Sequence, residues 1–257
     1  MASLKSQFVW QFLTWTHYKK WWPTQVADIE RGRRKNEISP PPFFKKHFEV
    51  QSEIFQNGII HQILGHNAEV TKHVVYIHGG AYIRGPLPQH WKFIKHLMNE
   101  CNVSVSLLVY PKTPEHHYQQ VYDFLLGSIE AISKRYKNVE TIWMGDSSGA
   151  SLVMGLMQIS HIYPKQLLLL FPWLDITLFN AAIDALESKD PILSKSSLRQ
   201  IGEWFSNGVK LNHPLLSPKN ASIEGWPPLH IICGTYDILY PDIKDFYTQQ
   251  RAVGNNE

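Results

Sequence analysis

The chain has 257 residues, of which 44% are hydrophobic, and a formal net charge of +3. The length fits one large α/β domain or two small ones, and the mild charge argues against a nucleic-acid partner. Its two cysteines, Cys101 and Cys233, are too few for a disulfide framework. The longest apolar run, Leu167–Leu174, is far shorter than the about 20 residues that cross a bilayer. We therefore expect no membrane span and a cytoplasmic location.

The N-terminal arm, residues 1–45, begins with an aromatic stretch. Phe8, Phe12 and Trp15 share one face of a helix. No small-residue cleavage site follows them, so we expect an amphipathic helix and not a signal peptide. This helix either packs on its own domain or makes a weak contact with a membrane surface, because tryptophans flanked by lysines favour a lipid interface. The sequence leaves both alternatives open.

Strand-like and helix-like segments alternate after the arm. Alternating polarity over Phe48–Phe55 and Ile59–Leu64, joined at Asn57-Gly58, predicts a hairpin at the edge of a sheet. The elements expected next are the strand Val74–Ile77, the helix Gln89–Glu100, the strand Val103–Val109, the helix Tyr118–Tyr136, the strand Val139–Met144, the helix Ser148–Ser160 and the strand Gln166–Phe171. This rhythm predicts a mostly parallel sheet with helices on both faces.

The rhythm breaks over residues 176–212. Within this insertion Ser194–Phe205 is helical in pattern, with Ser194 as its N-cap. We assign the insertion and the N-terminal arm to a helical cap. The sheet resumes with the strand Leu229–Cys233, and a helix is expected over Pro241–Val253.

The most informative segment is Gly145-Asp146-Ser147-Ser148-Gly149, which joins an expected strand to an expected helix. This is the G-x-S-x-G pattern in the strand–turn–helix setting that a serine nucleophile requires. The glycines allow the backbones of strand and helix to approach where a Cβ atom would clash. The pattern therefore nominates Ser147 as a nucleophile.

A second candidate segment is His78-Gly79-Gly80, which follows the strand Val74–Ile77. A His-Gly-Gly loop in this position presents backbone N–H groups to an oxyanion. We expect the donors to be Gly79, Gly80 and Ser148. Asp237 lies in the loop after the expected strand Leu229–Cys233. Because ligands bind outside the carboxyl ends of parallel strands, we expect the His78 loop, Ser147 and Asp237 to lie together at those ends.

Five motifs, in order, resemble those of the hormone-sensitive-lipase-like esterases of the α/β-hydrolase fold. They are HGGAY at 78–82, YPKTPEH at 110–116, GDSSG at 145–149, FPWLD at 171–175 and GTYDIL at 234–239. The resemblance implies that Ser147 is the nucleophile and that Asp237, not the nearby Asp242, is the acid of a catalytic triad. It also implies hydrolysis of a carboxylic ester through an acyl-enzyme, without a cofactor. The apolar cap segments favour small, uncharged esters with short to medium acyl chains. His116-His117 stands without the carboxylate and histidine partners of a metal site, so we expect no metal.

The departure from this family pattern concerns the general base. The family places a catalytic histidine after the acid, but no histidine follows Asp237 here, and the last is His230. We therefore expect a single domain over residues 1–257 that is C-terminally incomplete, without its last strand and helix. Two functions are compatible with this: a serine carboxylesterase whose activity is impaired in this chain, or a catalytically impaired or non-enzymatic, ligand-binding member of the fold.

Overall fold

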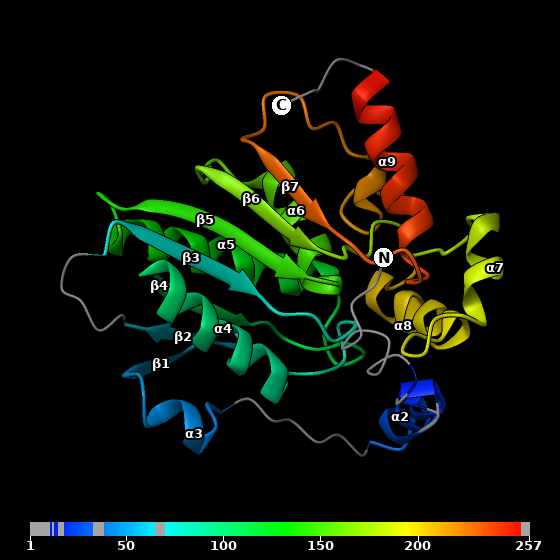
Figure 1. The fold of residues 1–257 in the computed structure, drawn as a ribbon, viewed down its shortest axis with the longest axis horizontal. Helices are drawn as coiled ribbons and strands as arrows, with labels where there is room; N and C mark the ends of the chain where they lie inside the picture. Colours follow the sequence, from blue (N-terminus) through cyan, green and yellow to red (C-terminus); the bar gives the residue numbers. More distant parts are fainter. Residues whose placement is uncertain (1–10, 12, 15–17, 33–38, 65–69, 253–257) are drawn as a thin grey trace.

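The computed structural model describes residues 11, 13–14, 18–32, 39–64 and 70–252. Its centre is a seven-stranded sheet with the strand order β1-β2-β4-β3-β5-β6-β7 (Figure 1). The strands are β1 (Val50–Phe55), β2 (Gly58–Ile63), β3 (Lys72–Ile77), β4 (Ser104–Val109), β5 (Glu140–Asp146), β6 (Gln166–Leu170) and β7 (Leu229–Ile232). Strands β3 to β7 are parallel, whereas β1 and β2 form an antiparallel hairpin at one edge. The expected mostly parallel α/β sheet is confirmed.

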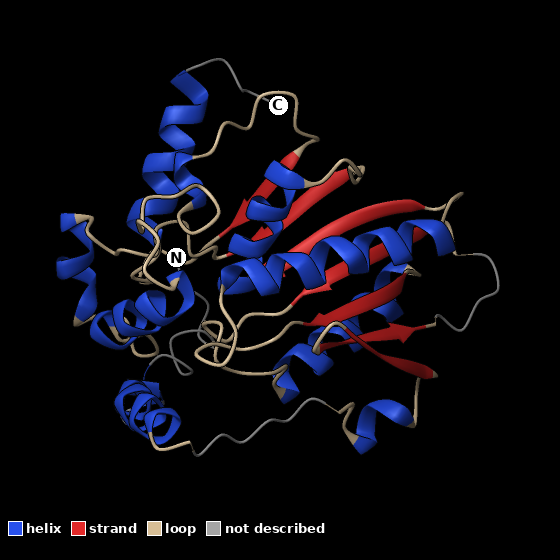
Figure 2. Ribbon diagram, turned by 180° about the vertical axis from the view of Figure 1, so that it is seen from behind, coloured by secondary structure: helices blue, strands red, loops and turns tan. Residues whose placement is uncertain are grey.

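Helices cover both faces of this sheet, as expected (Figures 1 and 2). They are α3 (Pro42–Lys45), α4 (Pro88–Cys101), α5 (Tyr118–Arg135) and α6 (Ser148–Ile159). Val74 and Tyr76 of β3 belong to a core shared with α3 and α4, whereas Val75 and Ile77 belong to a core shared with α5 and α6. Because successive strand residues point to opposite faces, a strand covered on both sides is apolar throughout.

The β1–β2 hairpin turns one residue earlier than expected. Gln56 and Asn57, with φ angles of 40° and 63°, form the two-residue loop, and Gly58 pairs with Phe55 as the first residue of β2. Two central residues with positive φ match the right-handed twist of a hairpin. Gly58 serves packing instead, because a Cβ atom there would lie 2.5 Å from the ring of Phe124.

The N-terminal arm and the 176–212 insertion contact each other. Their elements are η1 (Tyr18–Lys20), α2 (Trp21–Glu30), η2 (Ala181–Ile183), α7 (Asp184–Glu187) and α8 (Lys195–Ser206). Helix α2 packs against α8, and the Trp22 indole donates to the carbonyl oxygen of Ile192 at 2.7 Å. Ser194 caps α8 by accepting from the amide of Ser197, as expected. The expected N-terminal aromatic helix falls mostly outside the described residues, Phe8, Phe12 and Trp15 included.

Strand β7 forms the other edge of the sheet. It leads through the loop that contains Asp237 into α9 (Tyr240–Ala252), which packs against η3 (Pro218–Asn220). Helix α9 begins one residue before its expected start. Among the described residues, no helix combines the length and the apolar character needed to cross a membrane.

Candidate active site

Ser147 occupies a strained turn between β5 and α6. Its φ of 51° and ψ of −121° lie in a region that non-glycine residues rarely adopt. Such strain persists only where the surroundings fix the backbone. Here the Ser147 amide donates to the Leu170 carbonyl at 2.9 Å, and its carbonyl accepts from Trp173 at 3.2 Å. The expected strand–turn–helix setting is present, and Ser147 keeps a partly exposed side chain above a buried Ser148.

The glycines of the G-x-S-x-G pattern are required by close backbone packing. A Cβ atom on Gly145 would lie 2.6 Å from the carbonyl carbon of Gly149. A Cβ atom on Gly149 would lie well inside van der Waals contact with the carbonyl oxygens of Ile77 and His78. The start of α6 is therefore pressed against the end of β3, where the His78 loop begins.

The buried carboxylate of Asp146 joins this turn to the His78 loop. Its Oδ1 accepts from the Tyr76 hydroxyl at 2.7 Å and from the Gly79 amide at 2.8 Å, and His90 Nε2 lies 3.2 Å from its Oδ2. The amide of Gly79 is thus engaged with a side chain. The sequence pattern offered no signal for this role, because Asp146 stands at a variable position of G-x-S-x-G.

Three other amides are free to act as donors. Among the described residues, the N–H groups of Gly80, Ala81 and Ser148 have no hydrogen-bond partner. Gly80, Ala81 and Tyr82 have positive φ angles of 124°, 50° and 60°, so the loop curls at this point. Ala81 was missed in the sequence analysis, although its place directly after two glycines was a usable signal.

Aromatic stacking holds the curled loop in place. The Tyr82 ring stacks on Phe205 of α8 with centroids 3.9 Å apart and on Trp173 with centroids 5.4 Å apart. Phe205 is completely buried. The 176–212 insertion therefore packs directly on the loop that presents the free amides.

His78 is a bracing residue, and no hydrogen bond within the described part of the chain joins it to Ser147 or Asp237. Its Nδ1 donates to the Gly79 carbonyl at 2.6 Å, and its Nε2 accepts from Lys112 Nζ at 3.3 Å. A carbonyl only accepts and an ammonium only donates, so the ring is neutral with its proton on Nδ1. Burial, reinforced by the Lys112 charge, holds the pKa of His78 well below its ordinary value.

Asp237 lies in the loop between β7 and α9, at the same carboxyl end of the parallel strands as Ser147. Its Oδ1 accepts from the Leu239 amide at 2.8 Å. Burial raises the pKa of Asp237 to about 7, and the nearby charge of Asp190 adds to the shift. Among the described residues, no histidine forms a hydrogen bond with Asp237 or with Ser147. The competing carboxylate, Asp242, is instead paired with Lys219.

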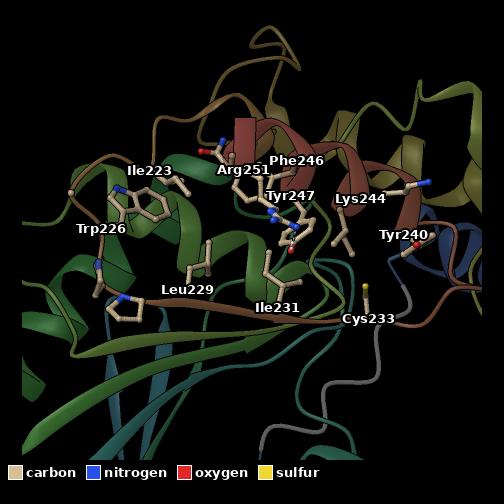
Figure 3. Close-up of a pocket in the computed structure, with 15 residues that line it drawn as sticks. Ile223, Trp226, Leu229, Ile231, Cys233, Tyr240, Lys244, Phe246, Tyr247 and Arg251 are labelled. Carbon is tan, nitrogen blue, oxygen red and sulfur yellow. Dashed lines mark hydrogen bonds between the residues drawn. The ribbon is translucent and has the colours of Figure 1, made fainter. Parts of the chain in front are cut away.

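A groove of about 870 Å³ runs between the free edge of β7 and α9. Figure 3 shows Leu229 and Ile231 of β7, and Cys233 directly after it, pointing into the groove opposite Phe246 and Tyr247 of α9. The groove is therefore on the Asp237 side of the site, and none of its lining residues belongs to the Ser147 turn or the His78 loop. The described residues contain no cluster of three or more side chains suited to hold a metal ion.

Comparison with known proteins places these features in a family. A sequence model of the alpha/beta hydrolase fold matches residues 74–257. An esterase of Acinetobacter venetianus is 30% identical over 70% of this chain and 61% of its own length. An acetyl-hydrolase of Streptomyces hygroscopicus is 24% identical over 66% of this chain and 59% of its own. The chain thus spans less than two thirds of the length of these relatives.

Solved structures share the same architecture. A hormone-sensitive lipase from a metagenome library superposes with a TM-score of 0.79 over 96% of this chain and 84% of its own, at 21% identity. An esterase from the bacterial hormone-sensitive lipase family superposes with a TM-score of 0.78 over 99% and 86%, at 19% identity. At these identities the likeness establishes the fold. Together with the family match, it shows that the chain belongs to the α/β-hydrolase fold family.

Proposed function

We propose that the protein hydrolyses carboxylic esters with Ser147 as the nucleophile. The observation that carries the proposal is the strained turn at Ser147, which Asp146 bonds to a loop with unpaired backbone amides. A fixed serine and fixed N–H donors are two of the parts that acyl transfer requires. Relatives named as an esterase, an acetyl-hydrolase and a triacylglycerol lipase support the same reaction class.

In this reaction Ser147 Oγ attacks the ester carbonyl carbon, and negative charge gathers on the carbonyl oxygen. We assign the stabilisation of that charge to the amides of Gly80, Ala81 and Ser148. Gly79, expected as a donor from the sequence, is replaced by Ala81 because its N–H is directed to Asp146. The alcohol then leaves, and water hydrolyses the acyl-enzyme. The proposal needs no cofactor.

Asp237 is the acid in this proposal. Such a carboxylate holds a histidine in the tautomer that accepts the serine proton and stabilises the resulting imidazolium. Because no described histidine reaches Ser147 or Asp237, we propose that the 257-residue chain turns over slowly by itself. In subtilisin, loss of the triad histidine lowers turnover by about 10⁶-fold.

The proposed substrates are uncharged esters with short to medium acyl chains. The arm (approximately residues 1–45) and the 176–212 insertion serve as the cap in this proposal, and the insertion places Phe205 against Tyr82 beside the donor loop. Apolar and aromatic walls with a few fixed polar groups are typical of small-molecule sites. A weak membrane contact through the aromatic N-terminal segment stays part of the proposal, since Trp-rich helices favour lipid interfaces.

A second candidate is a ligand-binding protein without catalytic turnover. The observation in its favour is the carboxyl of Asp237, whose pKa burial raises to about 7, with no cationic partner among the described residues. A triad acid beside an imidazolium would have a lowered pKa instead. The Ser147 site would then bind an ester without cleaving it.

Chemical rescue with imidazole tests the first function against the second. Hydrolysis of 4-nitrophenyl acetate is measured with and without imidazole, in the wild type and in Ser147→Ala, and mass spectrometry follows acetylation of Ser147. The rate of Ser147→Ala with imidazole measures the direct reaction of imidazole with the ester. We expect the wild type with imidazole to hydrolyse the ester faster than this background. Equal rates and no acetyl adduct would contradict the nucleophile assignment. Saturable binding of the ester without an adduct would support the ligand-binding alternative.

A further inference from the structure

The loop that contains Asp237 is more deeply buried on the side that leads into α9. Between the end of β7 and Asp237, no atom of the described residues lies within 4 Å of a Cβ atom built on Gly234, and Tyr236 is 57% exposed. After Asp237, by contrast, Ile238 and Leu239 are buried, and the Ile238 amide donates to Asp190 Oδ2 at 3.0 Å. The position of Asp237 therefore depends on how the N-terminus of α9 is anchored.

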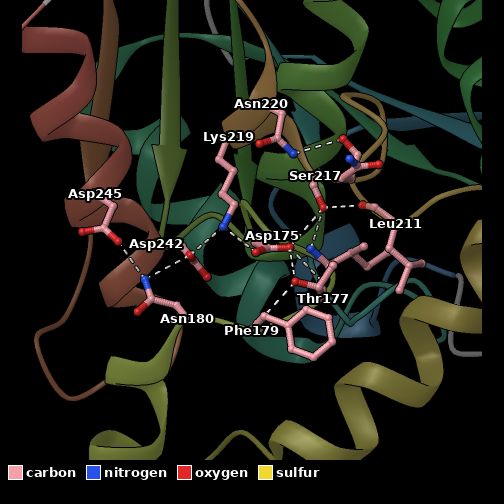
Figure 4. Close-up of polar contacts among 12 residues, drawn as sticks. Asp175, Thr177, Phe179, Asn180, Leu211, Ser217, Lys219, Asn220, Asp242 and Asp245 are labelled. Carbon is pink, nitrogen blue, oxygen red and sulfur yellow. Dashed lines mark hydrogen bonds and ion pairs between the residues drawn. The ribbon is translucent and has the colours of Figure 1, made fainter.

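Lys219 provides an ionic anchor for that helix end. Its Nζ lies 3.1 Å from Asp242 Oδ1, in the first turn of α9, and 2.5 Å from Asp175 Oδ2, in the loop after β6 (Figure 4). Both carboxylates are almost completely buried, with side chains 3% and 5% exposed, so the ammonium bridges two groups that would otherwise repel each other.

The Asp175 end of this bridge is a rigid support. Its Oδ1 accepts from the Thr177 amide at 2.9 Å, the Thr177 hydroxyl at 2.6 Å and the Ser217 hydroxyl at 3.2 Å. Burial raises the pKa of Asp175, but the hydrogen bonds from Lys219 and Thr177 outweigh this and lower the pKa overall. Asp175 is therefore a fixed anion.

The same loop is bonded to the Ser147 turn. Trp173 donates its amide to the Ser147 carbonyl at 3.2 Å and its indole N–H to the Asp175 carbonyl at 2.8 Å. The Lys219 amide also donates to the Leu174 carbonyl at 3.1 Å. A continuous set of contacts thus connects the nucleophile turn, through Asp175 and Lys219, to the helix that follows Asp237.

We propose that Lys219 is a positioning residue that fixes Asp237 relative to Ser147 by bridging Asp175 and Asp242. The inference rests on the proposed esterase function, but its first test does not depend on activity. Without the ammonium, two buried carboxylates face each other without a counter-charge, so the first turn of α9 moves away and takes the Asp237 loop with it.

The first test is hydrogen exchange on the whole chain in three variants. Lys219→Met removes the charge, Lys219→Arg keeps it, and Lys195→Met is the control, because Lys195 makes a comparable ion pair with the exposed Asp184. We expect Lys219→Met to speed amide exchange over residues 237–243 about tenfold or more, with β3 and β5 unchanged. Lys219→Arg and Lys195→Met should resemble the wild type. Unchanged exchange, or equal acceleration in every segment, would overturn the proposal.

The second test is a double-mutant cycle on the imidazole-supported hydrolysis. Lys219→Met should lower kcat about 10- to 100-fold with little change in KM, because small misplacements of catalytic groups have effects of that size. If Lys219 acts through Asp237, Lys219→Met combined with Asp237→Ala reacts no more slowly than Asp237→Ala alone. Additive losses, or a rise in KM alone, would contradict this role. If the wild type shows no Ser147-dependent hydrolysis, the esterase proposal fails and hydrogen exchange alone decides the role of Lys219.

Discussion

The turn at Ser147 and the loop at Asp237 both follow the carboxyl ends of parallel strands, but different contacts hold them in place. Backbone packing fixes the first, because Gly145 and Gly149 bring strand and helix into direct contact. Side chains from remote parts of the sequence fix the second, through Asp190 and Lys219. The strained turn at the nucleophile is thus held by backbone contacts with neighbouring strands, whereas the position of the acid depends on side chains from remote segments.

This difference has a physical basis in the position of the strands. Strand β5 lies between β3 and β6, so its carboxyl end is supported on both sides. Among the described residues, strand β7 pairs with a strand on one side only, and the groove beneath α9 borders its other side. A turn after a central strand can maintain an unusual φ, while a loop after an edge strand needs additional anchors.

The largest expected difference between the two regions comes from replacing one glycine by alanine in each. Gly149→Ala forces a Cβ atom against the carbonyl oxygen of Ile77, which cannot move without displacing β3, so we expect a loss of more than about 3 kcal/mol in the free energy of unfolding. Gly234→Ala meets no atom within 4 Å and should change stability by less than about 0.5 kcal/mol. Urea unfolding of both variants measures the difference. Similar losses at the two sites would remove the contrast between them.

A smaller effect is expected at the carboxylates that serve each region. Asp146→Ala leaves the buried donors of Tyr76 and Gly79 without an acceptor, at a cost of about 2–4 kcal/mol. Asp245→Ala, on the exposed side of α9, removes the hydrogen bond from Asn180 and should cost less than about 1 kcal/mol. Thermal and urea unfolding give both values. A tolerated Asp146→Ala would show that the His78 loop does not need this carboxylate.

The third prediction concerns pH, which should act with opposite signs on Asp237 and on His73, a buried histidine near the start of β3. Burial, with the Arg135 charge, lowers the pKa of His73 in β3 from 6.5 to about 3. Between pH 3 and 6.5 the unfolded chain therefore binds more protons than the folded chain. The free energy of unfolding decreases as pH falls from about 6.5 toward 3. The pKa of Asp237 rises from 3.8 to about 7 on folding, so the folded chain binds the additional proton between these values. The free energy of unfolding therefore decreases as pH rises from about 4 to 7.

Two variants separate these contributions. Asp237→Asn should gain stability over the wild type as pH rises from about 4 to 7, and His73→Gln should lose the protonation-linked decline at acid pH. Each slope approaches about 1.4 kcal/mol per pH unit. Urea unfolding at several pH values measures both. Parallel curves for Asp237→Asn and the wild type would mean that Asp237 titrates near its ordinary pKa.

Sequence patterns anticipated the features that depend on local geometry. The strand-to-helix turn at Ser147 and the cap of α8 by Ser194 arise from residues close together in the chain. The His78 loop was anticipated from its own glycines, although Asp146, which accepts from the Gly79 amide, is remote in sequence. The hairpin turn was placed one residue late, because Gly58 is a glycine for packing against Phe124 and not for the turn itself. Local signals could not distinguish these two uses of glycine.

The sequence alone determined the α/β class, the strand that precedes the nucleophile and the serine that the turn presents, since these depend on periodicity and on glycine spacing. Only the tertiary structure decided which amides stay free, because Asp146 occupies the Gly79 N–H. It also decided that Asp237 is anchored through Asp190 and Lys219, which are remote in sequence. Hydrogen bonds and ion pairs between distant segments leave no periodic trace in a sequence, so their partners become visible only when the chain is folded.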